Sequence, residues 1–555
     1  MHRMQRDCLM AGFLVWVLLG SQPSEAQYTA NFQTNMISGV TSNWAGSYIV
    51  GNTNFADALL IQSAGVQLNS GGDNFVGYAS SGSNNSVVVS GAGSAWSNHL
   101  ALVVGRSGAG NSLVISNGGH VHSFYEPIGY FGSGFVGYNQ GSSNNFVLIT
   151  DTGSVWSNDN TFSIGSEGSG NSLIISNGGQ MVNGNGYIGG GGLGGGGKNN
   201  SVLVTGPGSV WDNNGVVDVG GGKGSSNSLT IANGGQVIST AGLVGDVPSG
   251  DGVLVRDSGS VWSITSNLVM GFNSRGNSLV ISNGGQVVDS IGTIGYTSSG
   301  SNNSATVTGN GSVWSNGTLF VGEGGEWNSL VIGLGGSFGG RVISSNAIIG
   351  SSVSSSSNSV RVDYRGAWQN NTLVVGDQGS SNSLRIGDGS VSATNLVVGA
   401  ASTTCDNVVE VDVSGKLVVT NAAGTGVLEV RHGKLILNGG LVWVDTLVMT
   451  NPCAQFIDTG GTLIVGNVVL DPNTFRIVSV ARQSNDLLIT WMMGPGATNA
   501  LQATASDGSG GYSTNGFTDI FIVTNNTTVG TVTNYLDIGA ATNIPSRFYR
   551  ARLSP

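Results

Sequence analysis

The amino-acid sequence predicts an all-β fold: a parallel β-solenoid of about 15 three-stranded coils, followed by a small antiparallel β domain. A short phrase recurs along the chain, as NSLVISNGG at 111–119, NSLIISNGG at 171–179 and NSLVISNGG at 277–285. Hydrophobic residues make up 39% of the 555 residues and charged residues only 9%. The 94 glycines separate short runs of Val, Ile and Leu. This composition is typical of ordered β structure with tight turns and not of a disordered chain.

The N-terminus has the pattern of a secretory signal peptide over residues 1–26. The basic segment MHRMQRD is followed by an apolar stretch from Cys8 to Gly20, and Ser24 and Ala26 give the small-x-small pattern of a cleavage site. The apolar stretch is too short to span a bilayer as a stable helix. We therefore expect export to the cell surface or the medium, with no membrane span in the mature chain.

The period of the repeat defines the coil. Tryptophans recur 51 to 60 residues apart, in phrases such as GSVWSN (311–316), and an NGG phrase falls between successive tryptophan phrases. The two phrases align with each other, so the true unit is half as long and mostly spans 24–30 residues. Each unit contains three short β-type runs and no helical spacing. Three short strands make one turn of a solenoid, and stacked turns pair strand on strand at about 4.8 Å.

Alternation within the strands assigns the inner and outer faces. In the first strand of a coil, the positions of Leu113 and Ile115 are apolar in nearly every copy and should face inward. The position between them admits Arg361 and Arg385 and should face solvent. An asparagine begins most coils, and we expect these asparagines to form a ladder of side-chain hydrogen bonds along the stack. The NGG triplets should form corners that require positive φ.

The second strand contains the tryptophans. A column that includes Ala95, Val121, Val155 and Met181 is always apolar, so we expect it to face inward. The next column should then face outward. It contains His122, Val182, Ile238 and Val288 in alternate coils, and in the others six tryptophans: Trp96, Trp156, Trp211, Trp262, Trp314 and Trp368.

The two ends of the solenoid depart from the repeat. Residues 27–55 read as a half-coil that caps the first full coil, residues 56–470 as the solenoid, and residues 471–555 as an antiparallel, sandwich-like module. Cys405 and Cys453 occupy one column two coils apart, which gives a separation of about 9.6 Å. A disulfide needs Cα atoms within about 7 Å, so we expect free thiols.

The combination of GSVWSN, LxVG and NSLxISNGG at this spacing resembles the type V secretion and PEP-CTERM-associated repeat family, over roughly residues 84–400. That family occurs in exported bacterial proteins, including the passenger regions of autotransporters. The resemblance implies export and surface display with adhesin-like roles, and it implies no catalytic residue. Only about 85 residues follow the repeats, so we expect no translocator barrel after them.

Three groups of residues are candidates for chemistry. Asp246, Asp251 and Asp257 lie near Arg256, as in β-helical polysaccharide enzymes, but turn positions explain these aspartates equally well. The segment HVHSFYEP (120–127) contains His120, His122, Tyr125 and Glu126, a set that suits zinc, a partner contact or a tolerated insertion. Six outward tryptophans could stack on sugar rings or could simply cover the sheet.

The sequence therefore predicts a non-enzymatic, exported structural or adhesin-like solenoid without a cofactor. The alternative is a carbohydrate-binding solenoid that uses the tryptophan row, with His122 and Tyr125 as further contacts. A polysaccharide lyase or hydrolase is a distant third. The expected partners are polysaccharide or other surface and matrix components. Nucleic acid is not expected, because the net charge is −11.

Overall fold

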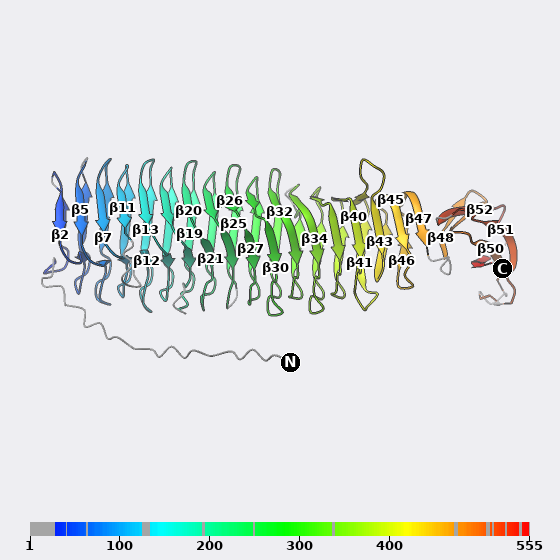
Figure 1. The fold of residues 1–555 in the computed structure, drawn as a ribbon, viewed down its shortest axis with the longest axis horizontal. Coiled ribbons are helices and arrows are strands. Elements are labelled where there is room, and N and C mark those ends of the chain that lie inside the picture. The colour runs from blue at the N-terminus through cyan, green and yellow to red at the C-terminus, as the bar shows by residue number, and fades with distance from the viewer. Residues whose placement is uncertain are drawn as a thin grey trace, which may run out of the picture.

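The computed structural model describes residues 28–553 except 40, 63–64, 125–133, 191–194, 248–249, 336–338, 471–475, 507–510, 513–514, 528–529 and 543–546. The expected signal peptide, residues 1–26, lies outside the described residues. The described chain forms a long rod of stacked coils with a small domain at its C-terminal end (Figure 1). This arrangement confirms the parallel solenoid and the antiparallel sheets that follow it.

The first strand of every coil belongs to one parallel sheet, in which each strand pairs with the equivalent strand of the next coil. Its 17 strands are close to the number of coils expected. They are β1 (Thr34–Ile37), β4 (Ala58–Gln62), β7 (Ser86–Ser90), β10 (Ser112–Ser116), β13 (Phe146–Thr150), β16 (Ser172–Ser176), β19 (Ser201–Thr205), β22 (Ser228–Ala232), β25 (Gly252–Arg256), β28 (Ser278–Ser282), β31 (Ser304–Thr308), β33 (Ser329–Ile332), β35 (Ser359–Val362), β38 (Ser383–Ile386), β41 (Asn407–Asp412), β44 (Gly433–Asn438) and β46 (Gln455–Asp458).

The second and third strands of the coils form two further parallel stacks. In four coils a single nine-residue strand runs through both stacks and joins them. These strands are β2 (Ser42–Trp44), β3 (Ile49–Val50), β5 (Gln67–Ser70), β6 (Asn74–Val76), β8 (Ala95–Asn98), β9 (Leu102–Val104), β11 (His120–Ser123), β12 (Gly134–Val136), β14 (Val155–Asn158), β15 (Phe162–Ile164), β17 (Gln180–Asn183), β18 (Gly186–Ile188), β20 (Val210–Asn213), β21 (Val216–Val219), β23 (Gln236–Ser239), β24 (Ala241–Val244), β26 (Val261–Ile264), β27 (Asn267–Met270), β29 (Gln286–Val288), β30 (Ile291–Ile294), β32 (Val313–Val321), β34 (Arg341–Ile349), β36 (Ala367–Gln369), β37 (Thr372–Val375), β39 (Ser390–Ala393), β40 (Asn395–Val398), β42 (Lys416–Val419), β43 (Val427–Val430), β45 (Leu441–Met449) and β47 (Thr462–Leu470).

A single hydrophobic core runs along the axis of the rod. Leu113 and Ile115 are fully buried in it, as the alternation predicts, and the outward position between them is partly exposed. Arg361 and Arg385 also face outward and pair with nearby carboxylates. Because no single coil can cover its own apolar side chains, each coil depends on its two neighbours for burial.

The predicted asparagine ladder is present and buried. At each position except the last, the backbone N–H donates to the side-chain Oδ1 of the equivalent residue in the next coil, at 2.8–3.1 Å. The ladder runs through Asp57, Asn85, Asn111, Asn145, Asn171, Asn200, Asn227, Asp251, Asn277, Asn303, Asn328, Asn358, Asn382 and Asn407. Each side chain satisfies a buried backbone donor that lies outside the strand pairing.

The NGG corners adopt the expected positive φ, which is 52° at Asn117 and 81° at Gly118. Their glycines allow the corners of successive coils to pack closely. At Gly119 a Cβ would lie only 2.3 Å from the Val89 carbonyl oxygen of the preceding coil. The recurring phrase therefore serves the stacking itself.

The N-terminal end is more regular than the half-coil expected. The strands β1, β2 and β3 form a complete coil and pair in parallel with β4, β5 and β6. The solenoid strands therefore begin at Thr34. In the part of the chain that the structure describes, no helix is long and apolar enough to span a membrane.

The C-terminal domain has two antiparallel sheets of three strands each. One contains β48 (Arg476–Gln483), β49 (Asp486–Met493) and β52 (Thr531–Asp537), and the other contains β50 (Thr498–Ala505), β51 (Thr518–Thr524) and β53 (Arg547–Leu553). Ile489, Trp491 and Leu501 form a core that both sheets share. Met492 packs on the solenoid core instead, and Val468 of the last coil bridges to Gly530. The domain thus covers the part of the stack end around Val468, while Ile457 and Ile464 of the last coil stay exposed.

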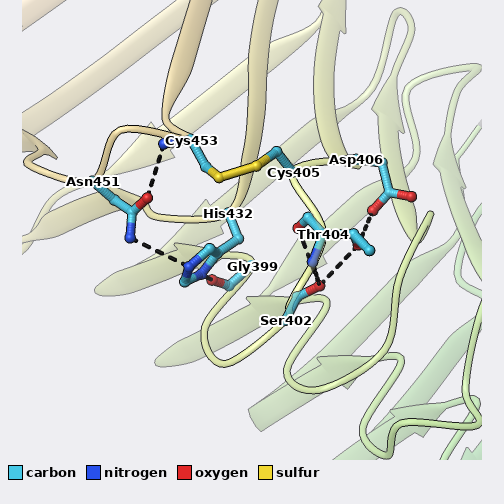
Figure 2. Close-up of a disulfide and its surroundings, with 8 residues drawn as sticks. All are labelled: Gly399, Ser402, Thr404, Cys405, Asp406, His432, Asn451 and Cys453. Atoms are coloured by element: carbon cyan, nitrogen blue, oxygen red, sulfur yellow. Dashed lines mark hydrogen bonds between the residues drawn. A yellow bond between two sulfur atoms is a disulfide. The ribbon is translucent and has the colours of Figure 1, made fainter.

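Cys405 and Cys453 form a disulfide with a Cα–Cα distance of 5.4 Å, so the prediction of free thiols is wrong (Figure 2). The two cysteines do lie two coils apart, because each precedes its strand, β41 or β46, by two residues. In the coil between them, however, the loop before β44 contains only Arg431 and His432. The two longer loops converge across this short one.

His432 lies between the two joined loops (Figure 2). Its Nδ1 donates to the carbonyl oxygen of Gly399 at 3.0 Å, and its Nε2 accepts from the Asn451 side-chain amide at 3.3 Å. Asn451 in turn accepts from the Cys453 backbone N–H at 2.9 Å. A neutral imidazole supplies one donor and one acceptor, so this ring connects both loops beside the S–S bond.

Candidate functional site

The six tryptophans expected to face outward are all buried, so this prediction is wrong. Their exposed fractions are 0–1%: Trp96, Trp156, Trp211, Trp262, Trp314 and Trp368. The cause is the length of the corner before them. Trp96 lies seven residues after the inward Val89, whereas Val121 lies six residues after Ile115. One extra residue shifts the register, so Trp96 pairs with Val121 and both side chains enter the core.

The remaining residues of that column do face outward in the intervening coils. His122 and Val182 are partly exposed, and Ile238 and Val288 are 37% and 42% exposed. The prediction therefore holds for one kind of coil and fails for the other.

Five of the six indoles, all except Trp96, follow a coil that has Gly or Ala in its third strand. An added Cβ at Gly186 would lie 2.5 Å from Cζ2 of Trp211, and one at Gly242 would lie 2.7 Å from Cζ2 of Trp262. Gly292 has the same relation to Trp314, at 2.8 Å. The tryptophan coils have Phe162, Val217, Leu268 and Leu319 in that column. Large and small residues thus alternate from coil to coil, which fills the core evenly.

Four of the six indole nitrogens donate a hydrogen bond to a polar side chain at the same corner of the preceding coil. The Nε1 atoms of Trp96 and Trp262 donate to Ser70 and Ser239. Trp211 donates to Asn183 at 2.7 Å and Trp314 to Asp289 at 2.6 Å. Trp156 and Trp368 have no partner for Nε1 in the described chain. The six side chains therefore serve packing and are closed to a ligand.

The acidic candidates are part of the architecture. Asp251 occupies a ladder position and accepts from the backbone N–H of Asn227 at 2.8 Å. Asp257 lies in a corner with φ 74° and contacts Arg256 at 3.4 Å. Asp246 follows the third strand and lies close enough to help raise the pKa of Asp218. In the described part of the chain, no three His, Cys, Asp or Glu side chains are placed to hold a metal ion.

Two buried carboxylates were missed by the sequence analysis. Burial raises the pKa of Asp218 to about 7, and the nearby Asp246 and Asp251 carboxylates add to the shift. Burial also raises the pKa of Asp289 to about 7, although the Trp314 indole N–H opposes the shift. Asp289 replaces the Ser or Asn that other coils place at this corner, and that substitution was the available signal.

The His122 loop contributes to a surface site. His122 Nε2 lies 3.2 Å from Asp159 Oδ1, and its ring lies 3.8 Å from the ring of Phe124. His120 is exposed. Tyr125 and Glu126 lie outside the described residues. The structure therefore does not test the predictions of zinc binding and of a tyrosine contact.

A groove runs across the corners of the first four coils, beside this loop. Its volume is about 440 Å³, within the usual range of ligand sites. Side chains from successive coils line it: Asn43, Trp44, Asn69, Ser97, His99 and Phe124. No sequence pattern points to it, because no motif connects the four coils. Among the described residues, this groove is the candidate functional site.

Comparisons with known proteins include a weak structural likeness. No family model and no curated protein matches the chain. A solved structure, that of the TibC-catalysed hyper-glycosylated TibA55-350 fragment, is 13% identical, covers 77% of this chain and 98% of its own, and has a TM-score of 0.27. No conclusion about function follows from a likeness of this size.

Proposed function

We propose that this chain is an exported, non-enzymatic β-solenoid that acts as a structural or adhesin-like component at the cell surface or in the extracellular matrix. The observation that carries the proposal is the uninterrupted stack of 17 strands, with its ladder and its single core. The residues that stand out most in the sequence, the tryptophans and asparagines, hold the coils together. A chain built in this way forms a long, stiff rod, which suits a structural role.

Two further features favour a location outside the cytoplasm. Disulfides persist in oxidising compartments, and the loops of Cys405 and Cys453 meet across a short corner. The segment 1–26 has the pattern of a signal peptide, and the repeats resemble those of exported bacterial proteins. Membership of the type V secretion and PEP-CTERM-associated repeat family is part of this proposal.

Cell fractionation tests the proposal. Cells that produce the chain with a C-terminal tag should carry it at the surface or release it, and mass spectrometry should find the N-terminus at Gln27. Leu14→Arg, which interrupts the apolar stretch, is the matched control and should retain the uncleaved chain inside the cell. Uncleaved wild-type chain in the cytoplasm would contradict export, and depolymerisation of a polysaccharide by the purified protein would contradict the non-enzymatic role.

A further inference from the structure

We propose that the groove across the first four coils binds a neutral polysaccharide chain, with the rings of Trp44 and Phe124 stacked on sugar units. This inference rests on the proposed function and names the class of partner. Because the tryptophan row is buried, the groove takes its place as the proposed site of carbohydrate recognition.

The two rings are exposed and held in position. Trp44 is 38% exposed, its Nε1 donates to the Ser47 carbonyl oxygen at 3.0 Å, and its edge packs on Tyr48 with ring centroids 5.8 Å apart. Phe124 is also 38% exposed and lies against the His122 ring. An aromatic face that is already ordered costs little entropy on binding. Such a face suits the C–H face of a sugar ring.

Polar side chains lie between the two rings at regular intervals. Asn43, Asn69 and Ser97 stand in register on successive coils, and the Asn69 amide donates to Asn43 Oδ1 at 2.7 Å. Amides and hydroxyls both donate and accept, as sugar hydroxyls do. The spacing of about 4.8 Å between coils is comparable to the length of one sugar unit along an extended glycan. Successive sugar units can therefore contact equivalent side chains on successive coils.

The charge of the site selects a neutral ligand. No Asp, Glu, Lys or Arg is among the described residues that line the groove. The chain as a whole has a net charge of −11, which repels acidic polysaccharides. A peptide strand could join only β2, whose partner among the described strands is β5 alone, whereas β5 and β8 are each paired on both sides.

Affinity electrophoresis of the purified full-length chain tests the inference. The gels contain laminarin, dextran or galactomannan as neutral probes, and alginate or polygalacturonate as acidic probes. At least one neutral polysaccharide should retard the wild-type chain. Trp44→Ala and Phe124→Ala should each weaken binding about tenfold or more, as expected for central aromatic contacts.

Trp443→Ala is the matched control, since Trp443 is 48% exposed and lies at the other end of the rod. It should leave the retardation unchanged. Circular dichroism of each variant should show that the fold is retained, and Asn69→Ala provides a second variant that removes no ring. The inference is overturned if no neutral probe binds, if only acidic probes bind, or if Trp443→Ala weakens binding as much as Trp44→Ala. Because binding is measured on purified protein, its failure is distinct from a failure of export.

Discussion

The coils that carry the asparagine ladder and the coils that follow it are held together in different ways. The ladder links each coil to the next from Asp57 to Asn407. In the following coil Gly433 stands opposite Asn407, and the ladder ends. The disulfide begins at Cys405, two residues before the last ladder asparagine, and reaches Cys453 across the coil that has no ladder residue. A covalent link thus replaces repeated hydrogen bonds where they stop.

The cores of the two regions also differ. Up to Trp368, a buried indole in one coil fits a Gly or Ala in the third strand of the coil before it in most of the stack. After it, Leu396, Leu428 and Leu447 follow one another in the same third-strand column. Trp443, in the later region, is on the surface. The difference indicates that the two-coil period comes from core packing and not from the ladder, whose hydrogen bonds are alike in both kinds of coil from Asp57 to Asn407.

The largest expected effect comes from making the same substitution in both regions. Trp211→Ala should lower the free energy of unfolding by about 3–5 kcal/mol, because it leaves a cavity in the core and removes the indole partner of Asn183. Trp443→Ala should cost less than about 1 kcal/mol, since its side chain is half exposed. Denaturant titration followed by far-UV circular dichroism measures both, and equal losses would contradict the assigned register.

The next largest effect should be confined to the end of the rod. Reduction, or Cys405→Ser with Cys453→Ser, should cost about 4 kcal/mol, because the disulfide closes a loop with a sequence separation of 48. Hydrogen exchange should then rise in the coils from β41 onward and stay unchanged in the coils around Asn200, because each coil interacts only with its neighbours. The same increase along the whole rod would contradict a local role.

Removing one ladder residue should have a smaller effect. Asn200→Ala takes the acceptor from both the backbone N–H and the side-chain amide of Asn171. The backbone N–H then has no acceptor and the amide keeps only its bond to the Ser142 carbonyl oxygen, so the loss should be about 2–3 kcal/mol. Asn438→Ala is the control beyond the ladder. Asn438 is exposed and its hydrogen bonds to Asp412 and Thr459 lie at the surface, so the substitution should change the free energy by less than about 0.5 kcal/mol. Equal losses in the two variants would contradict the role of the ladder.

The repeat allows the fold to be predicted from the sequence. The site depends on corner lengths and on the stacking register, which the repeat does not show. Leu113 and Ile115 were placed inward and the asparagines in a ladder, because alternation and period decide both. The outward prediction for Trp96 is wrong because the corner before it has one extra residue, which reverses the alternation. Aligning the repeated phrases does not reveal this difference in corner length. The disulfide was not predicted, because only the stacked structure shows that the loop at His432 is short enough for its two neighbours to meet.

The groove was not predictable for a different reason. Asn43, Asn69 and Phe124 belong to three separate coils, and each is ordinary within its own phrase. Only the stacking register brings them to one surface. A site assembled across coils has no motif, so the sequence of a solenoid reveals its scaffold more readily than its surface.

The smallest expected effect concerns Asp289. This residue accepts the hydrogen bond of the Trp314 indole, as Asn183 does for Trp211. The pKa of Asp289 is raised from 3.8 to about 7, so the folded chain retains a proton that the unfolded chain loses. This contribution to stability is complete below pH 3.8 and is lost progressively as the pH rises to about 7. The wild-type rod should therefore be less stable at pH 8 than at pH 5, with Asp218 and Asp251 adding to the same trend.

Asp289→Asn should remove part of this pH dependence and stabilise the chain at pH 8 by about 1–2 kcal/mol. An asparagine keeps the acceptor for the Trp314 indole, and its amide can donate to Asn316, whose side-chain atoms have no partner in the described chain. Asn183 and Asn213 make the equivalent contact at 2.7 Å, beside Trp211. Denaturant titrations at pH 5 and pH 8 measure the effect. An unchanged difference between the two pH values would show that the ionisation of Asp289 does not govern the stability of its coil.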